Sequence, residues 1–333
     1  MKYVYCHFPM TLALLTLPFS MLSLSIARSE TYTSPSKAGP IYKLQGEYMG
    51  VVESWGGTWG AQVIATSEKT ISIHLLDGGL PGQGFMGGLP SKVFDAEIEP
   101  KQEVAEANKD SIRLTVKPES LSIVGENGKK LGVLTKVVRE SQTLGAAPPA
   151  DGVTLFAVGG ANQFKDGKAT DEGFLGVGCT STERFGDHHL HIEFRVPFQP
   201  SDSGQGRGNS GVYVQGRYEV QVLDSFGLAG EDNECGGIYK IAKPRLNMCY
   251  PPLTWQTYDI DFTAAKYNES GEKSSNARVT IKHNGVLIHS DLELPMATPG
   301  KDKESKQPGP LYLQDHGNPV AYRNIWIQSK PAN

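Results

Sequence analysis

Residues 211–224, Gly211-Val-Tyr-Val-Gln-Gly-Arg-Tyr-Glu-Val-Gln-Val-Leu-Asp224, decide the class of fold. Successive side chains of a β-strand point to opposite faces of a sheet. In the second half of this stretch, Val220 and Val222 therefore point one way, whereas Glu219 and Gln221 point the other. We predict two β-strands here, the second with one apolar and one polar face.

Further short segments of the same kind lie on both sides of this stretch, at 190–196, 255–262, 278–282 and 286–289. A tight-turn sequence, His283-Asn-Gly285, separates the last two. Short strands at regular spacing, joined by turns, are typical of a β-sandwich or barrel. The 38 glycines and 21 prolines are spread along the chain, which suits many such turns. We therefore predict an all-β protein in which residues 153–330 form a β-sandwich.

A smaller β-rich domain is predicted at residues 39–142. Segments such as 70–75 and 112–116 alternate apolar and polar residues, and Asn127-Gly128 marks a hairpin turn. Residues 143–152 lose this periodicity and contain a Pro-Pro pair, so we predict a linker there.

The N-terminus has the pattern of a secretory signal peptide at residues 1–27. Lys2 precedes an apolar run at about 8–26, and Ser25-Ile-Ala27 is a small-x-small cleavage sequence. An uncleaved membrane anchor is the alternative, but two prolines interrupt the run, which has marginal length for a span. We expect an exported protein, periplasmic or extracellular, that is not inserted in a membrane after cleavage. Residues 28–38 are predicted to be a flexible lead.

The net charge argues against nucleic-acid binding, and the cysteine and histidine spacing gives no sign of a metal site. A formal net charge of -4 provides no basic stripe for nucleic acid. In an exported protein Cys235 and Cys249 would close a short loop and are the disulfide candidates, and at least one further thiol stays unpaired. No cysteine or histidine spacing indicates a metal site. Ca²⁺ would suit a lectin-like sandwich, but no Asp/Asn loop spacing requires it, so no cofactor is predicted.

The polar face of the strand at 218–224 has the residues of a sugar cleft. Glu219 and Gln221 share this face, and Asp224 joins them if a β-bulge intervenes. Carboxylates there can serve as acid, base or nucleophile, and neighbouring tyrosines can stack on sugar rings. Just upstream, Arg207-Gly-Asn-Ser-Gly211 has glycines that would let the backbone approach a ligand closely. A simple turn into the next strand explains that segment equally well.

A second strand, at 189–195, has the same alternation. His189, His191, Glu193 and Arg195 lie opposite Leu190, Ile192 and Phe194. A sandwich strand with one solvated face shows this pattern without any function. We therefore expect the four polar side chains on a solvated convex face.

An ordered series of segments along residues 150–330 resembles the 3-keto-disaccharide hydrolase domain family, whose fold is a concanavalin A-like lectin/glucanase jelly roll. The N-terminal domain lies outside this resemblance. The segments are His-Ile-Glu-Phe-Arg (191–195), Arg-Gly-Asn-Ser-Gly-Val-Tyr (207–213), Arg-Tyr-Glu-Val-Gln-Val-Leu-Asp-Ser (217–225), Cys-Gly-Gly-Ile-Tyr (235–239), Pro-Pro-Leu-Thr-Trp-Gln-Thr-Tyr-Asp (251–259), His-Asn-Gly-Val (283–286), Leu-Gln-Asp-His-Gly (313–317) and Tyr-Arg-Asn-Ile-Trp-Ile (322–327).

The resemblance implies cleavage of a glycosidic bond in a sugar already oxidised at C3. The ketone acidifies the hydrogen on C2, so a base can remove it, the group at C1 departs by β-elimination, and water then adds. This route requires a base, an acid and donors for the enolate oxygen. We expect Glu219 to be the base and Asp224 or His316 to be the acid. The substrate-binding residues expected with them are Arg207, Asn209, Gln221, Tyr239, Trp255, Gln314 and Arg323.

Two other functions fit the same residues, both with an oligosaccharide or glycoside as partner. A conventional glycosidase acting on unoxidised glucans would need two carboxyl groups about 5–9 Å apart, which Glu219 and Asp224 could supply. A non-catalytic, lectin-like module would bind sugar without turnover, since a fold does not fix a function.

Overall fold

The computed structural model describes residue 1, residues 30–98 and residues 103–331. The predicted signal peptide therefore lies outside the described residues, apart from Met1. The predicted flexible lead is fixed from Tyr32 onward, because the backbone N–H and C=O of Tyr32 both pair with Phe198, at 2.9 Å. No helix in the described part of the chain is both long and apolar enough to cross a bilayer.

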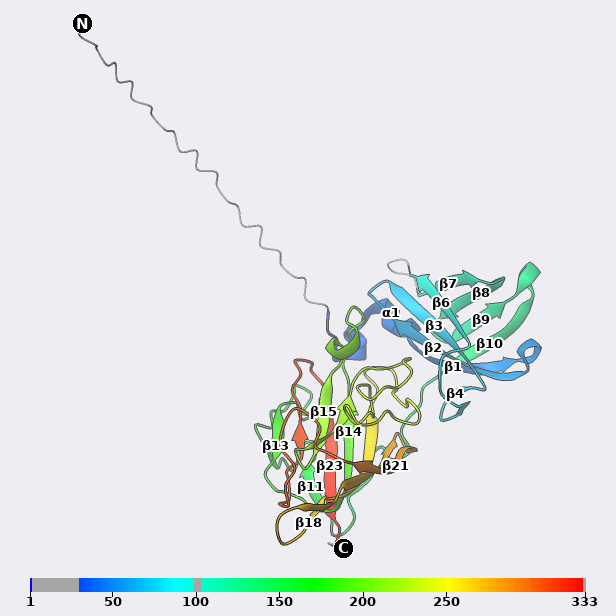
Figure 1. Cartoon of the computed structure of the whole chain (residues 1–333). Coiled ribbons are helices and arrows are strands. Elements are labelled where there is room, and N and C mark those ends of the chain that lie inside the picture. Colours follow the sequence, from blue (N-terminus) through cyan, green and yellow to red (C-terminus); the bar gives the residue numbers. More distant parts are fainter. Residues whose placement is uncertain (2–29, 99–102, 332–333) are drawn as a thin grey trace.

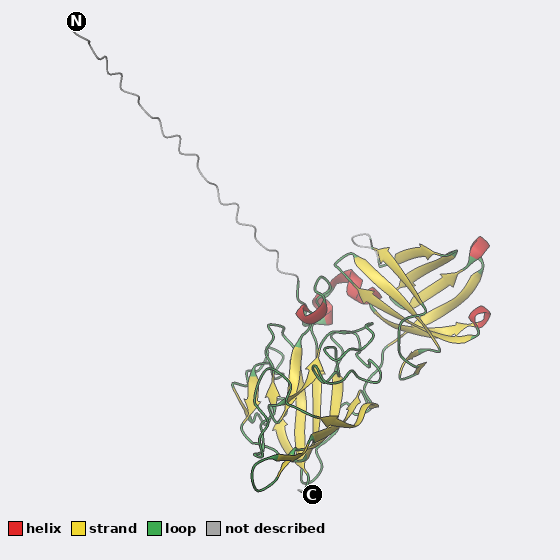
Figure 2. Ribbon diagram, in the orientation of Figure 1, coloured by secondary structure: helices red, strands yellow, loops and turns green. Residues whose placement is uncertain are grey.

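The fold is all-β, as predicted, and the chain forms two sheet assemblies (Figures 1 and 2). One short α-helix, α1 (Gly39–Leu44), precedes the first strand. The N-terminal assembly is an eight-stranded antiparallel sheet in the order β6-β3-β2-β1-β10-β9-β8-β7. Its strands are β1 (Gly46–Val52), β2 (Gly57–Ala65), β3 (Thr70–Asp77), β6 (Lys92–Glu97), β7 (Ala105–Lys109), β8 (Ile112–Lys117), β9 (Ser120–Val124) and β10 (Lys130–Val137).

The N-terminal sheet curls almost into a barrel, because its end strands β6 and β7 also contact each other. Its interior is filled by side chains, as expected for a small barrel. Alternate residues of β3 (Ile71, Ile73 and Leu75) are buried there, and α1 adds Ile41 and Leu44. The hairpin predicted at Asn127-Gly128 is confirmed, since β9 and β10 pair across a turn in which both residues have positive φ. Two very short strands, β4 (Leu80–Pro81) and β5 (Gly84–Phe85), form a separate pair.

The C-terminal assembly is the predicted β-sandwich. A six-stranded sheet has the order β11-β23-β14-β17-β20-β21, and a five-stranded sheet has the order β12-β13-β22-β15-β16. The first sheet contains β11 (Val153–Phe156), β14 (His188–Arg195), β17 (Gln256–Thr263), β20 (Ala277–His283), β21 (Val286–Leu294) and β23 (Ala321–Ser329). The second contains β12 (Phe164–Lys165), β13 (Cys179–Ser181), β15 (Ser210–Val214), β16 (Tyr218–Val222) and β22 (Tyr312–Leu313), while β18 (Lys266–Tyr267) and β19 (Lys273–Ser275) form a small extra pair.

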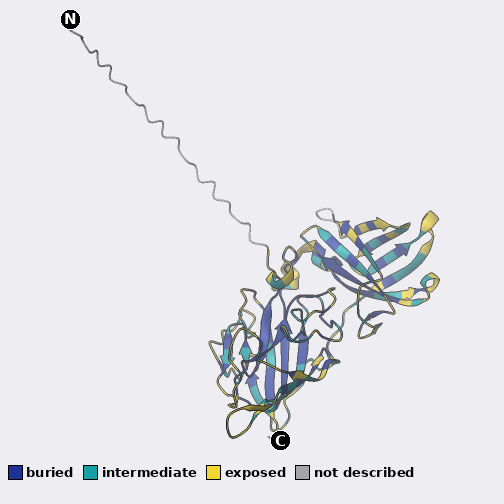
Figure 3. Cartoon of the chain, in the orientation of Figure 1, coloured by how far each residue is buried: buried dark blue, intermediate teal, exposed yellow. Residues whose placement is uncertain are grey.

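The two sandwich sheets enclose one hydrophobic core, visible as buried strands in Figure 3. Leu190, Ile192 and Phe194 of β14 point into it, and Val220 and Val222 of β16 point into it from the facing sheet. Period-two alternation therefore assigned the inner and outer faces of both strands correctly. The polar residues of β14 and β16 lie on the two outer faces of the sandwich.

The outer face of the six-stranded sheet is not solvated, which corrects the prediction for residues 189–195. Side chains of His191, Glu193 and Arg195 are 0%, 1% and 10% exposed, and only His189, at 24%, is partly open. The predicted linker covers this face. Gly145 donates its N–H to Glu193 Oε1 at 2.6 Å.

The next residue of the linker, Ala146, is also held in place by hydrogen bonds. The carbonyl of Ala146 accepts from Trp326 Nε1 at 2.9 Å and from Asn324 Nδ2 at 3.0 Å. Residues of the linker thus replace water on a face that alternation alone indicated to be wet.

The two assemblies also contact each other directly. Ile64 of β2 belongs to the sandwich core, and His74 Nδ1 lies 3.1 Å from the carbonyl oxygen of Gly227. Arg207 Nη1 donates to the carbonyl of Ala65 at 3.0 Å. The N-terminal sheet therefore contacts the loops that follow β16 and precede β15.

Candidate active site

The β15–β16 hairpin carries the candidate catalytic carboxylate on the outer face of the five-stranded sheet. Its short loop contains Gln215 and Gly216, both with positive φ, and it fixes a register in which Tyr213 pairs with Glu219. Tyr213 donates its hydroxyl proton to Glu219 Oε2 at 2.8 Å. The local sequence thus places a phenol and a carboxyl side by side on the polar face.

Glu219 is buried and has no cationic partner. The residue is 3% exposed, and no lysine, arginine or histidine among the described residues forms an ion pair with it. Burial raises the pKa of its carboxyl to about 7, although the Tyr213 hydrogen bond acts in the opposite direction. A carboxyl group with this pKa can accept a proton near neutral pH and return it.

Gly211 provides the space in which this carboxylate lies. A Cβ atom at position 211 would overlap Glu219 Oε1 and crowd its Cγ at 3.1 Å. The glycine was predicted to let a ligand approach the backbone, but in the structure the Glu219 side chain takes this space. A larger residue at this position would displace the candidate base.

A hollow of about 190 Å³ surrounds Glu219. Polar side chains on its walls are held by one another: Gln221 Nε2 donates to Asn209 Oδ1 at 2.8 Å, and Asn209 Nδ2 donates to the carbonyl of Gln205 at 2.8 Å. Gln314 Nε2 donates to the hydroxyl of Tyr213 at 3.3 Å. The lining residues are Gln205, Asn209, Tyr213, Glu219, Gln221, Tyr239, Pro299, Gly300, Gln314 and His316.

Six of the ten predicted catalytic and substrate-binding residues therefore meet in one hollow. They are Glu219, His316, Asn209, Gln221, Tyr239 and Gln314. They come from β16, from the segment before β15 and from loops after β16 and β22, so residues separated by about a hundred positions in sequence share one small volume. Glu219 is the only carboxylate among the described residues that line it.

Arg207 and Asp224 lie elsewhere, and they bind each other. Arg207 Nε donates to Asp224 Oδ2 at 2.7 Å, with the two side chains 9% and 0% exposed. The strand β16 ends at Val222, so Asp224 does not continue the face of Glu219. Neither residue lines the hollow, and the expected roles of acid and substrate ligand do not fit these positions.

Trp255 and Arg323 lie at the opposite, outer face of the six-stranded sheet. The Arg323 guanidinium lies 4.1 Å from the centre of the Trp255 ring, and its Nε donates to Glu193 Oε2 at 2.6 Å. Both were predicted to bind substrate with Glu219, but the whole sandwich separates them from it. They belong instead to the polar cluster beneath the linker.

The predicted disulfide is not formed. Cys179, Cys235 and Cys249 are all free and buried. Cys235 and Cys249 are nevertheless neighbours, because their thiols interact, and Cys235 Sγ also lies 3.2 Å from the hydroxyl of Tyr258. No group of three or more histidine, cysteine or acidic residues in the described part of the chain could hold a metal ion.

Sequence reasoning missed four residues that line this hollow: Gln205, Tyr213, Pro299 and Gly300. Tyr213 could have been found, because the short loop at Gln215-Gly216 fixes the register that sets it opposite Glu219. The loop at Pro299-Gly300 carries no such pattern. This loop comes close to the hairpin only in the folded chain, where the Tyr213 hydroxyl donates to the carbonyl oxygen of Pro299 at 3.1 Å.

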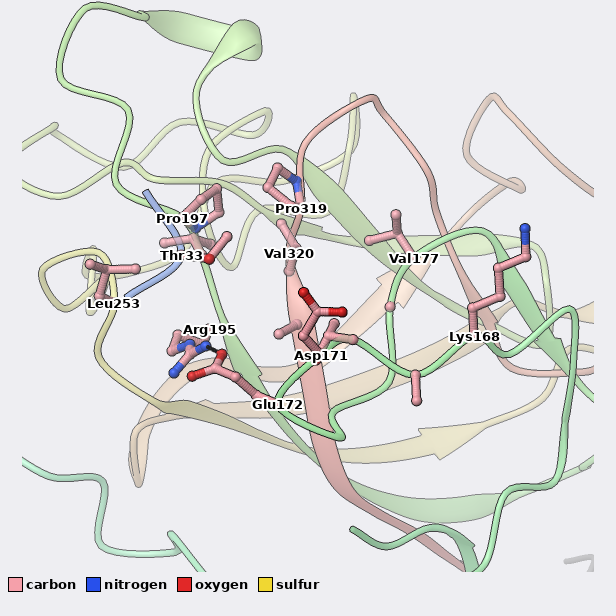
Figure 4. A pocket seen from close by; sticks show the side chains of 15 residues that line it. Thr33, Lys168, Asp171, Glu172, Val177, Arg195, Pro197, Leu253, Pro319 and Val320 are labelled. Atoms are coloured by element: carbon pink, nitrogen blue, oxygen red, sulfur yellow. Dashed lines mark hydrogen bonds and ion pairs between the residues drawn. The ribbon is translucent and has the colours of Figure 1, made fainter. Parts of the chain in front are cut away.

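A larger cavity, of about 430 Å³, lies where the N-terminal lead crosses the end of the sandwich. Figure 4 shows Arg195 and Glu172 joined in an ion pair on one side of it, with Asp171 nearby and with Val320, Pro197 and Leu253 among its apolar walls. None of the predicted catalytic residues lies there. The ion pair with Glu172 neutralises Arg195, so the hollow around Glu219 is the better candidate for the active site.

The fold and this hollow together define a class: a concanavalin A-like jelly-roll sandwich with one unpaired, buried carboxylate on an outer sheet face. The family model of the 3-keto-alpha-glucoside-1,2-lyase-like domain matches residues 123–328. The chain therefore belongs to this family. The match begins earlier than the resemblance at about residue 150, and so includes β10 and the linker.

One solved structure supports the same relationship. A candidate glycosyl hydrolase from Parabacteroides distasonis ATCC 8503 is 30% identical, with a TM-score of 0.50 over 55% of this chain and 85% of that chain. Two further candidate glycosyl hydrolases from this organism are each 16% identical. One has a TM-score of 0.35 over 53% of this chain and 87% of that chain, and the other 0.36 over 54% and 99%. No curated protein matches this chain.

Proposed function

We propose that this protein is a carbohydrate-active enzyme that cleaves the glycosidic bond of 3-keto-glycosides, with Glu219 as the base. The observation that carries the proposal is the buried carboxyl of Glu219, which has a pKa raised to about 7 and forms no ion pair with any described residue. Family membership and the candidate glycosyl hydrolase neighbour support a carbohydrate substrate.

The reaction balances with the residues of the hollow. Glu219 takes the C2 proton, and the electrons of the C2–H bond form an enolate with the C3 carbonyl. The enolate then restores the carbonyl and expels the oxygen at C1, which takes a proton from His316. Water then adds to the new C1–C2 double bond: His316 takes one proton from the water, the hydroxyl adds to C1, and the proton on Glu219 returns to C2. The amide of Gln314, which gives one N–H to the Tyr213 hydroxyl and keeps a second, is the available donor for the enolate oxygen. The amide N–H groups of Asn209 and Gln221 are already bonded within the protein.

A conventional glycosidase is less well supported. It requires two carboxyl groups on either side of the bond, about 5–9 Å apart. Glu219 has no second carboxylate among the described lining residues, and Asp224 is neutralised by Arg207. A lectin would gain nothing from a carboxyl that burial holds partly protonated at neutral pH.

The deciding experiment supplies the purified protein, from about Ser29 onward, with 3-keto and unoxidised forms of the same disaccharides. Cleavage of the keto form alone is expected. Cleavage of the parent sugar alone would favour the glycosidase, and binding without products would favour the lectin.

Glu219→Gln and Glu172→Gln form a matched pair for this assay. They make the same chemical change in the two cavities, and only the first should abolish turnover. Equal losses in both variants would contradict the assignment of the hollow.

A further inference from the structure

The two oxygens of the Glu219 carboxyl have different surroundings. Oε2 accepts the hydroxyl proton of Tyr213 at 2.8 Å. Oε1 lies against Gly211, whose missing side chain leaves room for it. It accepts no hydrogen bond from any described residue, and it keeps contact with solvent in the hollow. One oxygen of the candidate base is therefore held, and the other is open to a ligand.

The Tyr213 hydroxyl is itself fixed by several groups. Tyr213 is buried, and the register of the β15–β16 hairpin sets it opposite Glu219. Its oxygen accepts from Gln314 Nε2 at 3.3 Å, and the carbonyl of Pro299, at 3.1 Å, is a second acceptor for its proton. A phenol has one proton to donate, so it can serve the ionised carboxylate and turn to Pro299 when Glu219 is protonated. The hydroxyl thus has a partner in both charge states of the base.

The loop segment 298–300 holds this pair from outside the sheet. β16 is the last strand of its sheet, and the backbone N–H of Glu219 donates to Thr298 Oγ1 at 2.9 Å. Gly300 has a φ of +124°, and a Cβ atom there would overlap the Tyr213 hydroxyl oxygen. Neighbouring residues of one loop therefore contact both the backbone of the base and the phenol that bonds to it.

We propose that Tyr213 is the positioning residue of this site: its hydroxyl holds Oε2 of Glu219 and leaves Oε1 as the oxygen that takes the proton from the sugar and returns it. The inference rests on the proposed role of Glu219 as the base. A carboxyl that rotates freely would present either oxygen, and a misplacement of about 1 Å at a reacting atom can cost about a hundredfold in rate.

Other titratable groups surround the pair, but none of them replaces this contact. None forms a hydrogen bond or an ion pair with the Glu219 carboxyl in the described part of the chain. These groups are Tyr239, Tyr312, Tyr322 and His316, together with Lys301 and Asp302 of the loop that follows Gly300.

The first test compares Tyr213→Phe with Tyr312→Phe, which makes the same change in the neighbouring tyrosine of β22. Carbon-13 NMR of glutamate-labelled protein follows the Glu219 carboxyl without any substrate, and the Glu219→Gln spectrum assigns its signal. Tyr213→Phe removes a hydrogen bond to the ionised form, so the pKa of Glu219 should rise by about one unit or more. Tyr312→Phe should leave it unchanged. An unchanged pKa in Tyr213→Phe would overturn the proposal.

A second variant keeps the phenol and moves it. Gly300→Ala should displace the Tyr213 hydroxyl and shift the pKa of Glu219 in the same direction. Gly128→Ala is the matched control, because Gly128 also has positive φ but a Cβ there meets nothing within 4 Å. Equal pKa values in these two variants would count against the proposal.

Turnover of a 3-keto-disaccharide separates positioning from a simple change of pKa. At a pH of about 9.5, where the base is ionised in both proteins, Tyr213→Phe should still have a kcat about tenfold below that of the wild type. Full recovery of kcat there would overturn the positioning role. A shifted pKa in a protein that cleaves no keto sugar would support the held Oε2 and reject the proposed substrate, so the two failures are distinguishable.

Discussion

Replacing Glu219 by glutamine should make the protein inactive and, at alkaline pH, more stable. The side chain is 3% exposed, and burial raises its pKa from 4.5 to about 7. A difference of one unit between the folded-state and unfolded-state pKa corresponds to about 1.4 kcal/mol, so ionisation of this carboxyl destabilises the folded state by about 3 kcal/mol. Glutamine removes this charge and keeps an oxygen that can accept from Tyr213.

The sign of the effect follows from linkage. A carboxyl whose pKa is higher in the folded state is more easily protonated there than in the unfolded chain. Its ionisation therefore costs no stability below pH 4.5, and the cost grows as the pH rises to about 7. The stability of the variant relative to the wild type should increase across this window and level off above it.

Urea unfolding of both proteins at pH 4.5, 6 and 8 would measure this difference, together with turnover of a 3-keto-disaccharide at each pH. The variant should lose about a hundredfold or more in rate. Wild-type kcat/KM should rise with pH toward about 7, as the base becomes ionised. A relative stability that does not change with pH, or near-normal turnover of the variant, would refute the assigned base.

Three further substitutions test the hollow and its surroundings. Gly211→Ala should displace the base and reduce the rate about a hundredfold, whereas Gly206→Ala, where a Cβ meets nothing within 4 Å, should change neither rate nor melting temperature. Asp224→Ala should cost about 3–5 kcal/mol in urea unfolding, because it leaves Arg207 buried without its partner; a loss below 1 kcal/mol would argue against a buried ion pair. His316→Ala, at an exposed position, should lower kcat about a hundredfold without changing stability, and an unchanged kcat would exclude it as the acid.

Strand alternation predicted much of the fold and part of the site. It placed Glu219 and Gln221 on one outer face, because a period of two is imposed by the backbone itself. It could not place Asp224, since that depends on where β16 ends and on a pairing with Arg207 from another loop. Tyr213 was within reach of sequence reasoning, because the short hairpin loop sets its register.

The covered outer face shows a different limit. Alternation in β14 revealed that His191 and Glu193 share a face, but the same pattern arises whether water or another chain segment covers that face. The covering contacts come from Gly145 and Ala146, mostly through backbone groups. Backbone donors and acceptors are present in every residue, so no side-chain pattern announces them.

The two outer faces of the sandwich each hold a buried carboxyl group, and the pKa values of the two groups are shifted in opposite directions. Glu193 and Glu219 are about equally buried, at 1% and 3% exposed. Burial raises the pKa of Glu193, but hydrogen bonds from His191, Asn324, Gly145 and Arg323 outweigh it, and the pKa falls to about 2. Glu219 accepts one hydrogen bond, from the Tyr213 phenol, and forms no ion pair with any described residue, so burial determines the direction of its pKa shift. Burial alone therefore does not distinguish Glu219 from Glu193. The difference is that no charged partner compensates Glu219, because only an uncompensated carboxyl can exchange a proton at neutral pH.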